Sequence, residues 1–219
     1  MSFIALVADP KGPSIIGGKP RLPRDFEWPT HTWPLAEVEG WPDFARAEVA
    51  TAIAKGQARH EGARLVMPIA YLCQIDLADA ADDRLPKRGS LVFFASLTTD
   101  LPDARYGKRI ACAVRFVAHD ADVAPTTPPP APDESPDELR VRAQRTTDLA
   151  SEAHALFPPP ANEASGPMPP DGEVALLRLC ETAEIGLYIG DASWITFTIP
   201  ERDLAAFVFD DARASMFIG

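Results

Sequence analysis

The chain has 219 residues, of which 46% are hydrophobic and 24% are charged, a composition typical of a globular protein. A domain of this length buries roughly 70% of its unfolded surface, so it needs neither a disulfide nor a metal to fold. The net charge of −11 opposes binding to nucleic-acid phosphates or to anionic membrane surfaces, and instead favours solubility or a basic protein partner.

Prolines divide the chain into three parts. More than half of the 23 prolines lie within residues 125–170. We therefore expect a single domain spanning residues 1–219, with a first strand-rich block (1–122), a proline-rich middle part (123–172) and a strand-rich final block (173–219).

The first block begins with an irregular stretch that is rich in tryptophan and proline. Because proline denies the α region to the residue before it, we expect extended backbone here, with the tryptophans laid across a core. Asp43 suits the N-cap of a helix that runs to about Lys55. The Trp-Pro pairs are Trp28-Pro29, Trp33-Pro34 and Trp41-Pro42.

Strand signals dominate the rest of this block. Runs of apolar residues predict strands over residues 69–75, 90–95 and 109–118. Asp76 begins a predicted short helical turn, and residues 85–89 form a predicted turn into the second strand. Alternation in the third strand places four apolar side chains on one face, namely Ile110, Cys112, Val114 and Phe116.

The middle part is predicted to contain a linker, a helix and a loop. Residues 125–130 have the composition of a stiff polyproline linker. Residues 135–138, Ser-Pro-Asp-Glu, have the features of a capping box, which predicts a surface helix over residues 136–156. A loop is expected over residues 158–172.

The final block reads as strands with one helical turn. Strands grouped apart from helices, without regular βαβ alternation, predict an α+β fold with a few helices. The sequence Asp-Leu-Ala follows a predicted strand at Asp76 and again at Asp203, a weak internal repeat for which chance and duplicated halves both stay open. The predicted elements are strands over 174–180, 186–189 and 194–199, a helical turn over 201–205 and an edge strand over 207–209.

The sequence contains none of the common motifs for catalysis or metal binding that we considered. The sequence contains no G-x-G-x-x-G, H-E-x-x-H or G-x-S-x-G motif. The histidines have no partner at metal-ligand spacing, so we predict no catalytic residue, no metal and no cofactor; whether the chain is an enzyme stays open, with the balance against it. The four histidines, all expected on the surface, are His31, His60, His119 and His154.

The cysteines and the N-terminus both indicate the cytoplasm. Three cysteines lie far apart in apolar runs, which is typical of buried thiols in a reducing compartment. The apolar run from Phe3 to Ala8 is too short for the core of a signal peptide or for a membrane span. The cysteines are Cys73, Cys112 and Cys180.

Two polar residues stand out within apolar surroundings. Gln74 lies inside a predicted strand, and Asp191 follows a glycine shortly before Trp194. In the structural interpretation Gln74 bridges strands and Asp191 binds turn amides. In the functional interpretation they form a ligand pocket with Trp28 and Trp194, in which Asp76 and Asp191 supply acid–base chemistry.

An ordered set of segments resembles the YwqG-like bacterial family, a domain of unknown function. The resemblance implies an α+β fold with mainly antiparallel sheet and carries over no catalytic residue. Residues 30–67 look like an insertion relative to this pattern, and the proline-rich middle lacks a glycine- and glutamine-containing segment expected there. The matching segments are 16–20, 22–23, 28–29, 71–77, 85–86, Gly89, Leu91, 93–94, 190–191, 203–204 and 209–210.

Two functions are compatible with these observations. The first is an acidic protein-interaction module, of the immunity kind that neutralises a toxin, which binds a basic protein through the acidic end of the chain. The second is a small-molecule binder or enzyme with the pocket described above. Oligomeric state is left open. The interaction residues would be Glu201, Asp203, Asp210 and Asp211.

Overall fold

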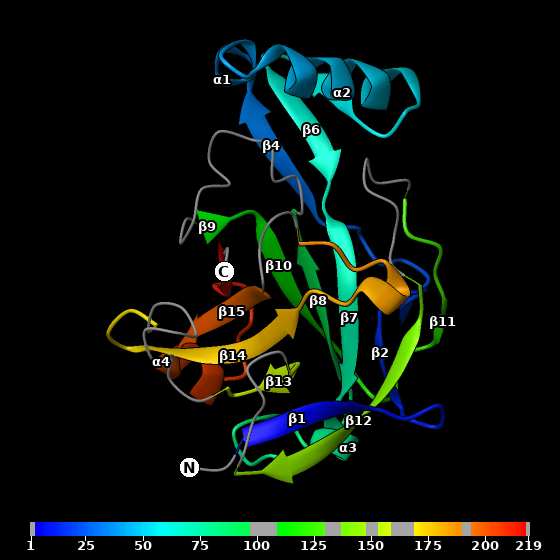
Figure 1. Ribbon diagram of the computed structural model, residues 1–219, viewed down its shortest axis with the longest axis vertical. Helices are drawn as coiled ribbons and strands as arrows, with labels where there is room; N and C mark the ends of the chain where they lie inside the picture. The colour runs from blue at the N-terminus through cyan, green and yellow to red at the C-terminus, as the bar shows by residue number, and fades with distance from the viewer. Residues whose placement is uncertain are drawn as a thin grey trace.

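The computed structural model describes residues 3–96, 109–129, 137–147, 153–158, 169–189 and 194–217. Its main feature is one antiparallel sheet of eleven strands (Figure 1). The strands follow the order β10 (Cys112–Val117), β8 (Ser90–Ala95), β7 (Ala70–Asp76), β2 (Ser14–Ile16), β12 (Leu139–Thr146), β1 (Phe3–Ala8), β13 (Ala155–Leu156), β14 (Glu173–Cys180), β15 (Trp194–Pro200), β16 (Arg213–Phe217) and β9 (Arg109–Ile110).

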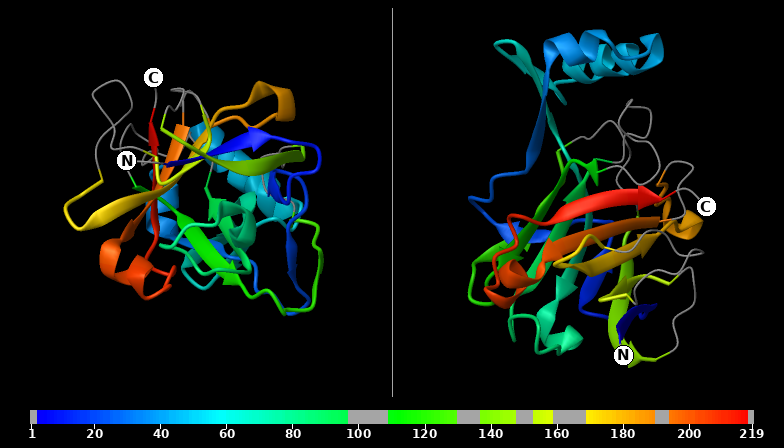
Figure 2. Two further views of the ribbon diagram at one scale, coloured as in Figure 1. Left: turned by 90° about the horizontal axis from the view of Figure 1, so that it is seen from below. Right: turned by 90° about the vertical axis from the view of Figure 1, so that its left-hand side faces the viewer.

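The sheet curls into a nearly closed barrel (Figure 2). Strands β9 and β10 adjoin in sequence, yet they end the sheet at opposite edges because β9 pairs with β16 while β10 pairs with β8. Two contacts cross this seam. The Cys112 thiol donates to the Ala212 carbonyl at 3.4 Å, and the Arg115 guanidinium pairs with the Asp210 carboxylate at 2.9 Å.

The barrel interior holds the largest apolar cluster. Alternate residues of each strand point inward, as Leu91, Phe93 and Ala95 do in β8. Phe93 meets Phe197 of β15 edge to face, with ring centroids 5.1 Å apart. The barrel interior is therefore the main hydrophobic core of the described structure.

A second apolar cluster lies on the outer face of β7, β8 and β10. The bulge in β7 between Tyr71 and Cys73 shifts its alternation, so that Gln74 and Asp76 point outward beyond Tyr71. Residues 17–29 and a two-stranded ribbon cover this face. The ribbon pairs β3 (Arg21–Pro23) with β11 (Val123–Pro125).

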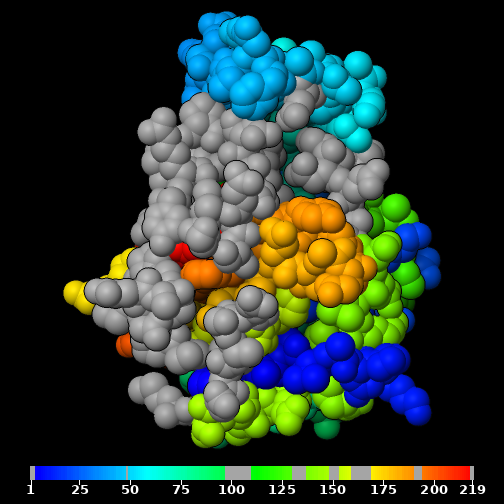
Figure 3. Space-filling view, in the orientation of Figure 1, coloured from blue at the N-terminus to red at the C-terminus, as the bar shows by residue number. Residues whose placement is uncertain are grey.

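Residues 30–68 form an arm that projects from one end of the barrel (Figures 1 and 2). The arm has its own apolar cluster, in which Trp33 and Trp41 meet edge to face at 5.7 Å. In the space-filling view the arm lies at the top of the molecule (Figure 3). Its elements are β4 (Thr30–Pro34), α1 (Leu35–Glu39), α2 (Asp43–Ala54), β5 (Arg59–Glu61) and β6 (Arg64–Pro68).

Short helical turns complete the structure. Helix α3 (Leu77–Ala80) follows β7, the 3₁₀ turn η1 (Ala183–Ile185) follows β14, and α4 (Glu201–Ala205) follows β15. Among the described residues, no helix is long and apolar enough to cross a membrane.

Most expected elements are confirmed. The predicted strands at 69–75, 90–95, 174–180 and 194–199 are present within a residue, and the helical turn at 201–205 is confirmed. The arm occupies residues 30–68, the stretch that the resemblance to the YwqG-like pattern marks as an insertion. Helix α2 follows the expected bounds, although Pro42 is its N-cap and Asp43 its first helical residue.

Four expectations about secondary structure and burial are wrong. Residues 139–146 form strand β12 within the expected helix, because alternate side chains face the barrel and the backbone pairs with β1 and β2. Residues 186–189 form isolated bridges at Leu187 and Ile189 in place of a strand, and residues 207–209 belong to a turn that precedes the true last strand. Phe116 is 43% exposed, unlike Val114 of the same predicted face.

Candidate functional site

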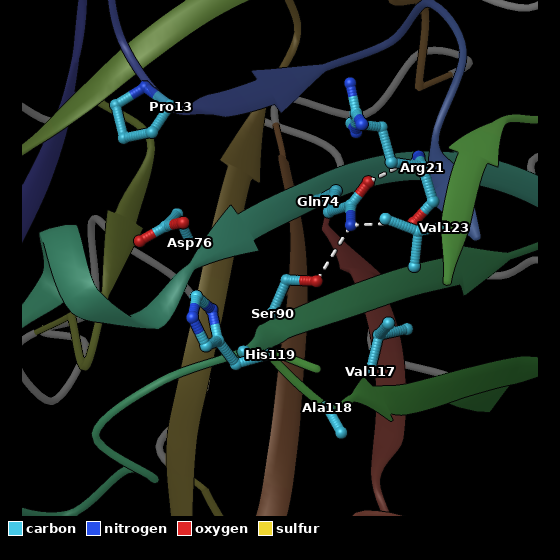
Figure 4. Close-up of a pocket in the computed structure, with 10 residues that line it drawn as sticks. Pro13, Arg21, Gln74, Asp76, Ser90, Val117, Ala118, His119 and Val123 are labelled. Atoms are coloured by element: carbon cyan, nitrogen blue, oxygen red, sulfur yellow. Dashed lines mark hydrogen bonds between the residues drawn. The ribbon is translucent and has the colours of Figure 1, made fainter. Parts of the chain in front are cut away.

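A small polar hollow lies where the outer apolar cluster ends (Figure 4). Its floor is the outer face of β7 and β8, and the β3–β11 ribbon forms the opposite side. The volume is about 160 Å³. The lining residues that carry polar side chains are Arg21, Gln74, Asp76, Ser90 and His119.

Gln74 holds the two sides of the hollow together. Its side-chain carbonyl accepts from the Arg21 backbone N–H at 2.7 Å. Its amide donates to the Arg21 carbonyl at 3.0 Å and to the Ser90 hydroxyl at 2.8 Å. Gln74 therefore acts as the strand partner that β3 lacks on this side, which is the bridging role expected from its place in a strand.

Asp76 combines two roles at the end of β7. Its backbone N–H donates to the Ser14 hydroxyl at 2.9 Å, and one carboxylate oxygen caps α3 by accepting from the Asp79 N–H at 2.9 Å. The carboxylate also lines the hollow, near His119. Of the residues in this hollow, the sequence singled out Gln74 and Asp76 but not the side chains of Arg21, Ser90 and His119 that lie opposite or beside them.

The structure does not gather the expected four-residue pocket. Trp28 packs edge-on against Phe94 at 5.1 Å, and its indole N–H donates to the Ile69 carbonyl at 2.9 Å, so it seals the outer cluster. Trp194 stacks on Phe217 in the β15–β16 pair, and five strands separate it from Gln74 in the sheet order. Asp191 lies outside the described residues.

The acidic interaction residues surround a turn between α4 and β16. Glu201 and Asp211 are exposed, and Asp210 pairs with Arg115 while its side chain stays 78% exposed. Asp203 is only 16% exposed and lies 3.3 Å from the guanidinium of Arg202. Three of the four carboxylates thus face solvent around one short segment.

The same turn exposes two apolar side chains that were not predicted as site residues. Phe207 is 47% exposed and Val208 is 45% exposed. The Phe207 N–H donates to the Leu204 carbonyl, and the Val208 N–H donates to the Asp203 carbonyl at 2.8 Å. This bonding closes α4 in the Schellman pattern, which places Phe207 in the left-handed region with φ of 56°.

That backbone position carries a local cost. Glycine is the usual residue there, because a side chain in the left-handed region costs about 1–2 kcal/mol. One buried carboxylate oxygen of Asp203 in the same turn also has no hydrogen-bond partner within the described part of the chain. The turn therefore combines an exposed aromatic, an unfavourable backbone angle and an unsatisfied acid.

The four histidines differ in their exposure to solvent. His60 and His119 are exposed as expected, and His31 is half-buried against Trp33. His154 is buried, so its predicted surface position is wrong. Its Nδ1 accepts from the Cys180 N–H at 3.0 Å and its Nε2 lies 3.1 Å from the Thr182 hydroxyl. These bonds connect the neutral imidazole to β14.

The cysteines are buried or half-buried free thiols, as expected from their apolar surroundings. Burial raises the pKa of the Cys112 thiol to about 12 and the pKa of Cys73 well above its usual range. Neither is activated as a nucleophile, since activation requires a lowered pKa. Within the described ranges, no group of three acidic, histidine or cysteine side chains could hold a metal ion.

Comparison with known families adds one match. The model of a family described as a domain of unknown function, DUF1963, matches residues 14–167, which is well over half of the chain. The chain belongs to this family. The DUF1963 region contains the arm and most of the residues around the hollow, whereas α4 and its turn lie beyond the matched residues. No curated protein matches the chain.

Proposed function

We propose that this DUF1963 protein is an acidic protein-interaction module that binds a basic partner through the turn after α4. The immunity kind of module, which neutralises a toxin by binding it, is the form that we favour. The observation that carries the proposal is the exposed Phe207, held in the left-handed region and surrounded by carboxylates.

The turn has the composition of an interaction centre with a charged rim. Aromatic side chains dominate the binding energy of protein interfaces when they are desolvated at the centre of the contact. Phe207 and Val208 provide such a centre, and Glu201, Asp210 and Asp211 provide the rim. A partner with one apolar pocket flanked by lysines or arginines would complement both parts.

Stability does not explain the choice of residue at this position. A glycine at position 207 would adopt the same backbone angle without steric cost, and it would remove an exposed aromatic side chain from water. A costly residue at an exposed position is typical of a functional site, since strain concentrates where binding or catalysis requires a particular side chain.

The rim charges are expected to control the rate of association. Attraction between oppositely charged surfaces raises the association rate and is screened by salt. The net charge of −11 adds a long-range attraction for any basic protein. Dissociation should instead depend on the apolar centre, because most affinity differences within one interface appear in the dissociation rate.

The test begins with affinity capture from the native host's lysate at low and high salt, followed by kinetics with the purified partner. Glu201→Gln, Asp210→Asn and Asp211→Asn together should slow association several-fold at low salt and flatten its salt dependence. A control chain with Glu37→Gln, Glu39→Gln and Glu184→Gln loses the same charge elsewhere. Equal effects of both triple variants would contradict the proposal.

We also propose a family branch and a cellular location for this protein. Membership of the YwqG-like branch is supported by the segments around Gln74 and Leu85, and a cytoplasmic location is supported by the free buried thiols. Expression of the tagged chain in its host, followed by fractionation, tests the location. Recovery in an oxidising compartment would contradict it.

A small-molecule function is the second candidate, and the hollow beside Gln74 is the observation that favours it. It collects polar side chains from four segments at the edge of an apolar cluster, as ligand sites do. Trp28 and Trp194 serve packing in this arrangement, whereas Gln74 and Asp76 of the expected site line the hollow.

A further inference from the structure

The hollow is large enough to hold a small polar metabolite. Its volume is about 160 Å³. The hollow also opens to solvent between β8 and the β3–β11 ribbon, so a ligand can enter without a change of fold.

Several polar groups in the hollow lack partners. The second carboxylate oxygen of Asp76, the hydroxyl proton of Ser90, the guanidinium of Arg21 and the imidazole of His119 make no hydrogen bond or ion pair with any residue that the structure describes. These groups offer donors on one side and an acceptor on the other.

Opposite charges share the hollow without pairing. Among the described residues, the Arg21 guanidinium and the Asp76 carboxylate form no salt bridge with each other or with another group. The backbone of Arg21 is fixed because Gln74 bonds both its N–H and its carbonyl. Arg21, whose side chain is exposed, and Asp76 therefore belong to separate walls of one small space.

The balance of charges selects the ligand class. A phosphate would meet one arginine but also the Asp76 carboxylate, which repels it. A metal cation would find one carboxylate and at most one imidazole, fewer ligands than a metal site requires. We infer that the hollow binds a small zwitterion, a free α-amino acid, whose ammonium faces Asp76 and whose carboxylate faces Arg21 and Ser90.

This inference deepens the small-molecule candidate and rests on it. The test is isothermal titration calorimetry of the full chain with each standard amino acid at up to about 10 mM, with acetate and methylammonium at the same concentration. We expect at least one amino acid to bind with a dissociation constant of about 1 mM or tighter, and both single-charge probes to bind at least about tenfold more weakly.

Two variants locate the site without disturbing the fold. Arg21→Gln keeps the backbone groups that bond Gln74, and Asp76→Asn keeps the helix cap because asparagine caps as well as aspartate. Each should weaken binding by at least about tenfold. Arg24→Gln, an exposed arginine outside the hollow, is the matched control and should change nothing.

The outcomes separate the inference from the candidate function. Absence of binding by every amino acid, equal binding of acetate, or unchanged binding by both variants would overturn the inference. Co-purification of an uncharged or anionic molecule that Arg21→Gln or Asp76→Asn displaces would overturn the zwitterion but support a small-molecule site. If native mass spectrometry and the titrations both find no ligand, the small-molecule function fails as well.

Discussion

Two short helices of this molecule each lead into a residue with positive φ, and the two turns have very different surroundings. Helix α3 follows β7 and is capped by Ala81, whose φ is 47°, while α4 follows β15 and leads to Phe207, whose φ is 56°. Both segments contain the sequence Asp-Leu-Ala. Both turns use the left-handed region, and the contrast that bears on binding lies in their side chains.

The acids around α3 are bound internally. Asp79 accepts from the Ala143 N–H at 2.6 Å and pairs with Arg142 at 3.3 Å, and Asp82 pairs with Arg84 and Arg145. Around α4, Glu201 and Asp211 have no ion-pair partner among the described residues. The charges of the α3 turn therefore stabilise the barrel, whereas those of the α4 turn stay available to the proposed partner.

The largest predicted effect is the loss of folding stability that the titration of His154 causes in acid. Burial, aided by the nearby Arg178 cation, lowers the pKa of His154 from 6.5 to about 4. The unfolded chain therefore binds the proton first, so stability is complete above pH 6.5 and falls as the pH drops towards 4, by about 3 kcal/mol. Urea unfolding of wild type between pH 7.5 and 4 should show this loss.

His154→Asn, which can still accept from the Cys180 N–H, should remove most of this dependence. The control is His60→Asn, because His60 is exposed. A wild-type stability that stays constant across this range, or an equal effect of both variants, would contradict the assignment.

The next effect contrasts one ion pair at each turn. Asp82 is 5% exposed and bonds Arg84 through both oxygens, whereas Asp210 is 78% exposed and bonds Arg115. Asp82→Ala should lower the free energy of unfolding by about 2 kcal/mol, and Asp210→Ala by less than about 1 kcal/mol. Equal losses in urea titrations would remove the distinction between the turns.

The dependence of stability on acid pH gives a second test of the ion pair between Asp82 and Arg84. The bonds to Arg84 lower the pKa of Asp82 from 3.8 to about 2. The stabilisation from this group is therefore present above pH 3.8 and is lost as the pH falls through about 2. In the His154→Asn background, Asp82→Ala should reduce the remaining loss of stability below pH 4, to which the carboxyls of Asp9 and Asp83, whose pKa values are also lowered, contribute as well.

A smaller effect compares the two left-handed residues directly. Ala81→Gly and Phe207→Gly should each raise the free energy of unfolding by about 0.5–1 kcal/mol, because glycine adopts positive φ without steric cost. Of the two variants, only Phe207→Gly should weaken binding of the partner, by about tenfold or more. A destabilised Phe207→Gly chain would show that Phe207 serves packing.

The smallest expected effect on stability concerns the acidic rim. Glu201→Gln with Asp211→Asn should change the free energy of unfolding by less than about 0.5 kcal/mol, because neither carboxylate has a partner among the described residues. Thermal unfolding measures this directly. A large loss would mean that these acids stabilise the fold, and the contrast between the turns would fail.

Much of this architecture can be predicted from local patterns in the sequence. The turn 201–205 follows a strand and contains its own helix signals, and the Trp-Pro pairs mark the arm that carries its own cluster. The family model over residues 14–167 agrees with the expectation of an uncharacterised domain family. Such features depend on neighbours in sequence, which a single chain displays.

Features that depend on distant partners are the ones that the sequence misses. Residues 139–146 carry a helix-like start signal, and only pairing with β1 and β2 shows that their alternation belongs to a strand. His154 lies in a polar segment but is buried by β14. The hollow joins Arg21 to Gln74 across 53 positions, and no local signal connects them.

The most direct test of the interaction surface is site-specific photo-crosslinking in the native host. A photoreactive phenylalanine analogue replaces Phe207 in one chain and Tyr188, which is 61% exposed, in another. We expect one dominant adduct with a basic protein at position 207, lost at high salt, and none at position 188. Absence of an adduct at position 207, or the same adducts at both positions, would contradict it.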